Sequence, residues 1–187
     1  MVIKGKKNYL RTKREKDLDA LYELACDFEA RGPYYPVSIP AETTFKQRFQ
    51  ENGSWSNDYG ALLICNLADD EILGEISHFK AAPYFDGFEI AYRLYDSGQS
   101  RRGIMTEALI LFTYVLFTTK KINRLELKII PENIPSKRVA EKCGYQLEGV
   151  NRGAIFHRGA YRDMEVHSIL RDEAPARLED VLDRINL

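Results

Sequence analysis

The sequence predicts a single α/β domain of the α+β type, with helices packed against a mixed, mostly antiparallel sheet. Three strand patterns follow one another at residues 60–67, 72–80 and 88–95, and a tight turn joins the first two as a hairpin. An almost uniformly apolar helix is then expected at 103–119, and a helix that is hydrophobic on all sides has to be covered by a sheet. We therefore expect an antiparallel meander that leads into a buried helix.

The segments before the meander predict a strand and two helices. A short strand is expected at 9–12, and apolar residues at helical spacing begin after Asp17. A shorter helix is predicted after Pro40, with Thr43 or Thr44 as its N-cap residue. The chain thus begins with strand, helix and helix.

The segments after the buried helix predict further strands and helices. An aliphatic strand is expected at 124–130, and a short helix at 136–143 ends at Gly144 in the C′ position. Extended structure follows, with a last strand at 163–170 whose side chains alternate in polarity. A charged tail helix is expected after Pro175.

Length and charge exclude several classes of protein. The 187 residues fit one domain. Lys and Arg number 27 and Asp and Glu 28, and the formal net charge of −1 gives no general attraction for nucleic acid or an anionic membrane. No apolar run approaches the ~18 residues of a membrane span, and the basic stretch 1–16 lacks the apolar core of a signal peptide. We expect a cytoplasmic monomer or homodimer with no nucleic-acid or membrane partner.

Cysteines and histidines show no pattern of metal ligands. Cys26, Cys65 and Cys143 are widely separated and odd in number, which predicts reduced, packed thiols. The histidines also lack metal-ligand spacing. The sequence therefore predicts no metal site.

The segment 89–109 has the pattern of an anion site. A strand passes through a turn that contains Arg101 and Arg102 into the buried helix, which Gly103 opens. The first turn of a helix has unpaired N–H groups and a partial positive charge, and glycine lets a phosphate approach the backbone. A helix-entry glycine beside a solvated turn would give the same pattern. The phosphate-loop and dinucleotide fingerprints are absent, so a different phosphate-bearing ligand is indicated.

Several segments resemble the GNAT superfamily of N-acetyltransferases, and within it the branch of the ribosomal-protein N-terminal acetyltransferases (RimJ/RimL-like). They are EIAY at 89–92, RGIMTEA at 102–108, PENIPSKRVAEKCGY at 131–145, QLEG at 146–149 and GAYRD at 159–163. The resemblance covers about residues 8–173. It implies a GNAT fold with a splayed sheet of about seven strands and about four helices, in a single N-acetyltransferase domain at 1–187 whose tail helix lies at 175–187.

The resemblance implies acetyl-CoA as cosubstrate and assigns residues to it. The diphosphate would lie at the basic turn and the helix start, at Arg101, Arg102, Gly103, Ile104, Met105 and Thr106. The pantetheine arm would pair with the backbone near Leu94, in a slot between the strands 89–95 and 124–130. Asn133 would bind this arm through its amide, although turns also favour Asn.

Two positions depart from the usual pyrophosphate loop of the family. Ser100 stands where Gln or Arg is usual, and Met105 stands where Gly or Ala is usual. Backbone donors survive such changes, but the bulk of Met105 could alter how closely a phosphate approaches. A non-catalytic acyl-CoA-binding regulator is therefore an alternative from a different class.

The resemblance also suggests catalytic residues. Transfer to an amine needs a base for the amine, stabilisation of the oxyanion and a proton for the thiolate. Ser136 is the predicted donor to the thiolate, although it could also be an N-cap residue. Glu89 is the predicted base, and His78 is a second candidate whose alternative is a packed side chain. An N–H group near Leu94 would polarise the acetyl carbonyl.

The acceptor is a primary amine whose identity the sequence leaves open. Tyr34, Tyr35 and Trp55 lie in segments that wall the acceptor cleft in this family, and His78 and the segment 156–159 are further candidates. The aromatic residues could equally cover the core. The acceptor could be the α-amine of a protein N-terminus, or a small molecule such as an antibiotic or an aminoacyl compound.

Overall fold

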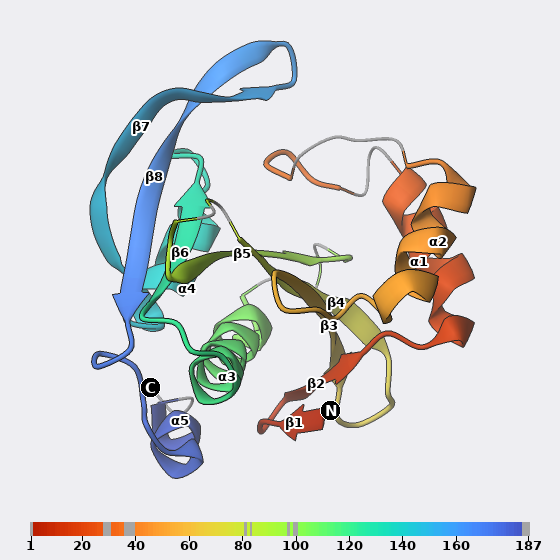
Figure 1. Cartoon of the computed structure of the whole chain (residues 1–187), viewed down its shortest axis with the longest axis horizontal. Coiled ribbons are helices and arrows are strands. Elements are labelled where there is room, and N and C mark those ends of the chain that lie inside the picture. Colours follow the sequence, from red (N-terminus) through yellow and green to blue (C-terminus); the bar gives the residue numbers. More distant parts are fainter. Residues whose placement is uncertain are drawn as a thin grey trace.

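The computed structural model describes residues 2–27, 31–35, 40–80, 82, 84–96, 98 and 101–184 (Figure 1). Its elements along the chain are β1 (Val2–Lys4), β2 (Asn8–Thr12), the 3₁₀ helix η1 (Glu15–Asp17), α1 (Leu18–Cys26), α2 (Glu42–Asn52), β3 (Tyr59–Asn66), β4 (Ile72–Phe79), β5 (Gly87–Leu94), α3 (Ile104–Thr119), β6 (Arg124–Ile129), α4 (Ile134–Lys142), β7 (Gln146–His157), β8 (Ala160–Leu170) and α5 (Leu178–Arg184). The predicted α/β class is confirmed.

The strands form one mixed sheet in the order β1-β2-β3-β4-β5-β6-β8-β7. The meander β3-β4-β5 is antiparallel, whereas β5 and β6 pair in parallel. A parallel pair needs a long crossover, and α3 supplies it. The expected meander that leads into a buried helix is therefore confirmed.

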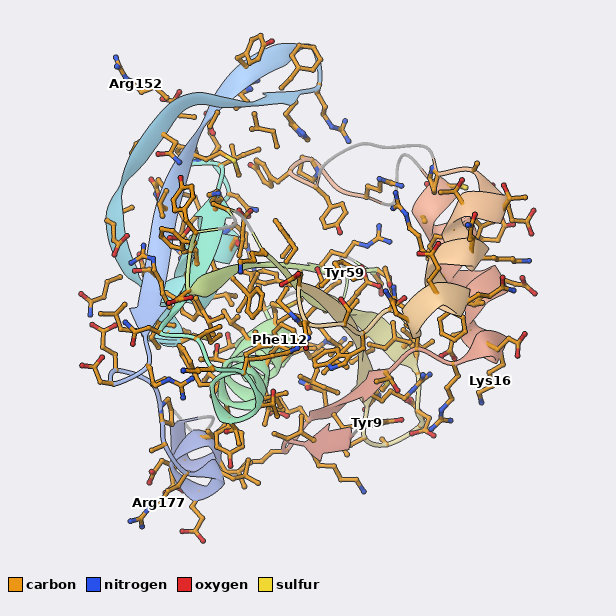
Figure 2. All side chains as sticks on the ribbon, in the orientation of Figure 1. Tyr9, Lys16, Tyr59, Phe112, Arg152 and Arg177 are labelled. Atoms are coloured by element: carbon orange, nitrogen blue, oxygen red, sulfur yellow. The ribbon has the colours of Figure 1, made fainter. Side chains whose placement is uncertain are left out.

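The two faces of the sheet carry different helices. Because side chains alternate between the faces of a strand, Leu62 of β3 belongs to the core under α3, whereas Leu63 packs with Leu21 of α1 on the other face. Phe112 of α3 is fully buried at the centre of the larger core (Figure 2).

Among the described helices, none is long and apolar enough to cross a bilayer.

β2 confirms the strand predicted at 9–12, whereas β1 was not predicted, and a buried carboxylate holds the β1–β2 hairpin against α3. The N–H groups of Lys7 and Asn8 donate to Glu107 Oε1 at 2.9 and 3.0 Å. Asn8 Nδ2 donates to the carbonyl oxygen of Ile104 at 3.1 Å. A Cβ atom at Gly5 would lie 2.0 Å from Glu107 Oε1, so any larger residue would displace this carboxylate from its position. The turn before β2 is thereby fixed beside the first turn of α3.

Replacing Glu107 with alanine is expected to lower the free energy of unfolding by about 2–4 kcal/mol, because two backbone N–H groups lose their acceptor. Chemical denaturation measures the change. Glu141→Ala, which removes an exposed carboxylate from α4, is the matched control and should change stability by less than about 0.5 kcal/mol. Equal losses in the two variants would show that the buried carboxylate has no special role.

The start of α2 differs from the prediction. The helix begins at Glu42 with Ala41 as its N-cap residue, so the prediction of a cap at Thr43 or Thr44 is wrong. Both threonines lie within the first turn, where their N–H groups need no helical acceptor. The preference of threonine for caps therefore did not decide this helix boundary.

The cysteines follow the prediction only in part. Cys65 and Cys143 are buried, whereas Cys26 is exposed at the end of α1, so the prediction of a packed thiol is wrong for Cys26. Cys26 lies on the solvent side of the last turn, whereas its neighbour Ala25 is buried. Within the described ranges, no group of three or more His, Cys, Asp or Glu side chains is arranged to hold a metal ion.

Candidate active site

β5 and β6 are paired at only one end. The parallel ladder joins residues 87–89 of β5 to residues 124–126 of β6. Beyond Glu89, β5 continues to Leu94 in its pairing with β4, and β6 continues to Ile129 in its pairing with β8. The two strands diverge from this point (Figure 1). The backbone edge of β5 is therefore available to the polar groups of a ligand.

α3 presents its first turn beyond the end of β5. Gly103 is its N-cap residue and has a φ of +76°, a left-handed conformation that favours glycine. The N–H group of Glu107 donates to the carbonyl oxygen of Gly103, and the preceding N–H groups have no acceptor within the helix. These groups belong to Ile104, Met105 and Thr106. With the partial positive charge of a helix start, they can bind a phosphate.

The side chain of Met105 does not obstruct this turn. It is 7% exposed and packs in the core under the sheet. Met105 can therefore offer its N–H group to a ligand while its bulk lies in the core. Ser100, the other departure from the family pattern, lies outside the described residues.

Three described cations lie at the helix start. Arg101 and Arg102 are exposed beside Gly103. Lys7, in the turn before β2, donates from Nζ to the carbonyl oxygen of Arg102 at 2.9 Å. The sequence prediction missed Lys7 because 95 positions separate it from Arg102, and only the basic character of the first residues hinted at it. These charges and the free N–H groups fit a diphosphate.

α4 begins with a capping amide near the diverging strands. Asn133 is the N-cap residue, and its Oδ1 accepts a hydrogen bond from the N–H group of Ser136 at 3.3 Å. The helix begins at Ile134, before the predicted start, because Pro135 fits a first turn without needing an N–H acceptor. Ser136 is therefore not the N-cap residue. The amide oxygen of Asn133 caps the helix, and the NH₂ group of the same side chain can donate to a ligand.

Ser136 and Tyr92 bring two hydroxyl groups together between α4 and β5. Ser136 Oγ lies 2.7 Å from the Tyr92 hydroxyl. Burial raises the pKa of Tyr92 well above its usual value, so this hydroxyl keeps its proton at neutral pH. The sequence prediction missed Tyr92 because its partner is 44 positions away. The hydroxyl of Ser136, the predicted proton donor, is thus oriented by a second hydroxyl.

Glu89 lies at the point where the strands diverge. It is the last residue of β5 that pairs with β6, opposite Glu126. Lys128 Nζ lies 2.7 Å from Glu89 Oε2, and Arg124 Nε lies 2.6 Å from Glu126 Oε1. Glu89, the predicted base, therefore lies where β5 and β6 begin to diverge, and it forms an ion pair with Lys128.

A family model described as an acetyltransferase (GNAT) domain matches residues 8–146. The chain belongs to the GNAT acetyltransferase family.

Relatives of this GNAT domain are acetyltransferases. The chain is 29% identical over 185 residues to the "Probable N-acetyltransferase YjcK" of Bacillus subtilis, covering 92% of this chain and 98% of that protein. It is 26% identical over 161 residues to the ribosomal-protein-serine acetyltransferase of Escherichia coli, covering 84% and 89%. Its fold is similar to that of Mycobacterium smegmatis RimJ in complex with CoA-disulfide, with a TM-score of 0.77, 23% identity and coverage of 96% and 88%. The chain is an acyltransferase enzyme with the GNAT fold.

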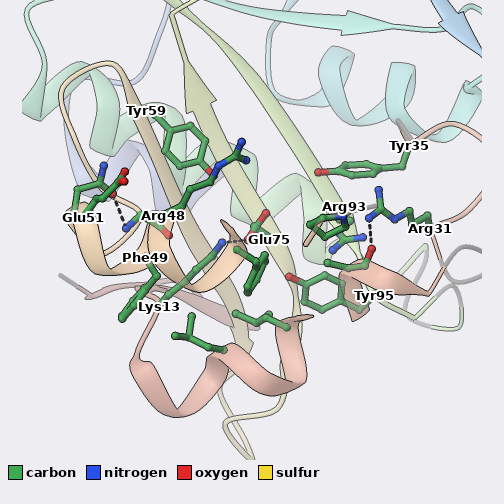
Figure 3. A pocket seen from close by; sticks show the side chains of 17 residues that line it. Lys13, Arg31, Tyr35, Arg48, Phe49, Glu51, Tyr59, Glu75, Arg93 and Tyr95 are labelled. Atoms are coloured by element: carbon green, nitrogen blue, oxygen red, sulfur yellow. Dashed lines mark hydrogen bonds and ion pairs between the residues drawn. The ribbon is translucent and has the colours of Figure 1, made fainter. Parts of the chain in front are cut away.

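A cavity of about 390 Å³ lies on the α1–α2 face of this GNAT domain (Figure 3). Tyr35, Tyr59, Glu75 and Arg93 are among the residues that line it. Of the three aromatic residues predicted on the acceptor side, Tyr35 lines this cavity, whereas Tyr34 and Trp55 do not. Only one of the three predicted aromatic residues therefore reaches it.

The loop after α1 contacts the connection before α4 and the end of β7. The Tyr34 hydroxyl donates to the carbonyl oxygen of Glu132, in the connection before α4, at 3.1 Å. His157 Nε2, at the end of β7, lies 2.6 Å from the carbonyl oxygen of Pro33. The segment 156–159, which was expected on the acceptor side, therefore meets this loop. Tyr34 joins the same loop to the connection before α4.

His78 lies in the core under α3, on the face opposite the cavity. It is fully buried, and its ring centroid lies 4.6 Å from that of Phe88 and 5.2 Å from that of Trp55. Neither ring nitrogen has a hydrogen-bond partner in the described structure. Gly60, its register partner in β3, leaves room for the ring. The predicted acceptor contacts of His78 and Trp55 are therefore wrong, because both side chains face α3.

His78 is expected to make this GNAT domain less stable as the pH falls from about 6.5 to 4. Burial lowers the pKa of folded His78 to about 4, so between these values the unfolded state binds more protons and stability falls on acidification. The full effect is about 3 kcal/mol. Denaturation curves at pH 7 and pH 4.5 should show a smaller loss for His78→Phe than for wild type. The same loss in both proteins would mean that His78 is already charged or accessible when folded.

Proposed function

We propose that this GNAT enzyme transfers the acetyl group of acetyl-CoA to the α-amine of a protein N-terminus. The divergence of β5 and β6 beside the free first turn of α3 carries the proposal. A diphosphate fits the N–H groups and cations at this turn, and an amide-bearing arm fits the open backbone edge of β5. When bound, acetyl-CoA supplies an activated thioester.

The residues that would hold acetyl-CoA form two groups. The N–H groups of α3 bind the diphosphate, and Arg101, Arg102 and Lys7 add charge. The backbone of Leu94 and the NH₂ group of Asn133 bind the pantetheine arm, because both lie beside the region where β5 has lost its pairing with β6. The coenzyme is thereby oriented along β5.

The proton transfers are assigned to Glu89 and Ser136. Glu89 takes the proton of the acceptor ammonium, directly or through a water. Lys128, its ion-pair partner at 2.7 Å, holds the carboxylate in place. Ser136 Oγ gives a proton to the departing thiolate and regains one from solvent. Tyr92, at 2.7 Å, is a positioning residue that orients the Ser136 hydroxyl.

A protein N-terminus is the favoured acceptor for two reasons. The relative from Escherichia coli is named for acetylation of a ribosomal protein. The cavity on the α1–α2 face also includes Arg93, which lies on the same face of β5 as Glu89 and four residues further along the strand. Residues that follow the reacting amine could reach this cavity along β5, whereas a small amine at Glu89 would not.

Thiol release from acetyl-CoA tests the proposal with a panel of amines. The panel contains peptides with a free N-terminal Ser or Ala, spermidine and an aminoglycoside. Peptides are expected to give the highest kcat/KM. Faster release with spermidine or the aminoglycoside would reassign the acceptor. No release with any amine, while the coenzyme binds, would contradict catalysis and favour an acyl-CoA-binding regulator.

A further inference from the structure

The cavity on the α1–α2 face has an excess of positive charge among the described residues that line it. Its cations are Lys13, Arg31, Arg48 and Arg93, and its carboxylates are Glu51 and Glu75. Lys13 Nζ lies 2.5 Å from Glu75 Oε2, so this carboxylate already has a partner. The remaining lining therefore favours an anionic ligand group.

Arg93 is held between two aromatic rings in this cavity. Its guanidinium carbon lies 4.9 Å from the ring centroid of Tyr35 and 4.7 Å from that of Tyr95, and Figure 3 shows it between the two rings. Burial raises the pKa of both tyrosines, so at neutral pH neither ring offers a negative oxygen. Arg93 Nε is buried and has no hydrogen-bond partner in the described ranges. A buried donor of this kind is expected to have a partner when the cavity is filled.

The distance between Arg93 and the proposed base Glu89 follows from their positions in β5. Arg93 and Glu89 lie on the same face of the strand, four residues apart, which is about 13 Å at 3.3 Å per residue. Ala91 lies between them, opposite Ser77 of β4. Both side chains are small, so an extended chain can lie along this face.

We infer that the acceptor is a peptide N-terminus with an acidic side chain at its third or fourth residue, whose carboxylate pairs with Arg93. This inference rests on the proposed function. An extended peptide advances about 3.3–3.6 Å per residue, so three steps from the amine bring a side chain within reach of the guanidinium. A polyamine would meet like charges here, and the α-carboxylate of a free amino acid lies too close to its own amine.

The test compares two peptides that differ only by Glu or Gln at the fourth residue. The wild-type enzyme is expected to have at least about a tenfold higher kcat/KM for the Glu peptide, because a hydrogen-bonded ion pair with a half-buried arginine is among the stronger polar contacts. Arg93→Gln should reduce this ratio to below about twofold, chiefly by lowering kcat/KM for the Glu peptide. Arg152→Gln, an exposed arginine of β7 away from the cavity, is the matched control (Figure 2).

Binding measured without turnover separates this inference from the proposed function. Calorimetry with CoA present and the N-acetylated forms of both peptides should show about tenfold tighter binding of the Glu form to wild type. If no acetyl transfer occurs but this selectivity exists and depends on Arg93, the proposed function fails and the acidic specificity stands. Equal wild-type binding of the two forms, or better use of spermidine than of the Glu peptide, overturns the inference even if Arg93→Gln does not fold.

Discussion

Gly103→Trp is expected to weaken the binding of CoA by at least about 100-fold, as measured by calorimetry. A tryptophan would have to adopt the left-handed φ of +76°, and its Cβ would lie 2.9 Å from Lys7 Nζ. The indole would displace the ammonium of Lys7 and lie beside the N–H groups that face the diphosphate. Two lost charge-assisted hydrogen bonds account for a factor of this size.

Gly153→Trp is the matched control for this change. Gly153 also has a positive φ, of +58°, but a Cβ there has open space around it, in the β7–β8 hairpin. Its backbone strain should be similar, and its affinity for CoA should remain within about twofold of wild type, since it lies outside the binding turn. A folded Gly103→Trp protein that binds CoA normally would reject the first turn of α3 as the diphosphate site.

Ser136→Ala is expected to lower kcat by about 100-fold while the affinity for CoA changes little, because general acid catalysis contributes ~10²–10⁴ to a rate. Tyr92→Phe should lower kcat by about tenfold, since the Ser136 hydroxyl remains but loses its partner at 2.7 Å. Single-turnover measurements of thiol release separate the chemical step from binding.

The outcome for the double variant tests whether the two hydroxyls act as one unit. Ser136→Ala combined with Tyr92→Phe should be no slower than Ser136→Ala alone, because Tyr92 acts through Ser136. Additive losses would mean that Tyr92 acts on the reaction by itself. Normal kcat for Ser136→Ala would remove this serine from the mechanism.

Local sequence patterns were enough to predict the frame of the site. The meander and the almost uniformly apolar α3 follow from periodicity. The start of α3 follows from Gly103, because glycine adopts the left-handed conformation there easily. These features depend on residues that are neighbours in the chain. The divergence of β5 and β6 was implied by family resemblance, because a strand pattern does not say where pairing ends.

Long-range contacts account for what the sequence did not predict. Lys7 reaches the start of α3, the proposed diphosphate site, because the buried Glu107 holds its turn. Tyr92 meets Ser136 because α4 brings this serine to β5. His78 has a suitable unperturbed pKa, but its position in β4 turns it toward α3. Which face of a strand is buried depends on the helices that cover it, and periodicity alone does not identify that face.

The most direct measurement is the structure of the enzyme crystallised with CoA. We expect the diphosphate oxygens within hydrogen-bond distance of the N–H groups at the start of α3, and the arm along β5 beyond Glu89. CoA bound elsewhere, or a ladder between β5 and β6 that continued past Glu89 and left no room for the arm, would contradict the proposed site.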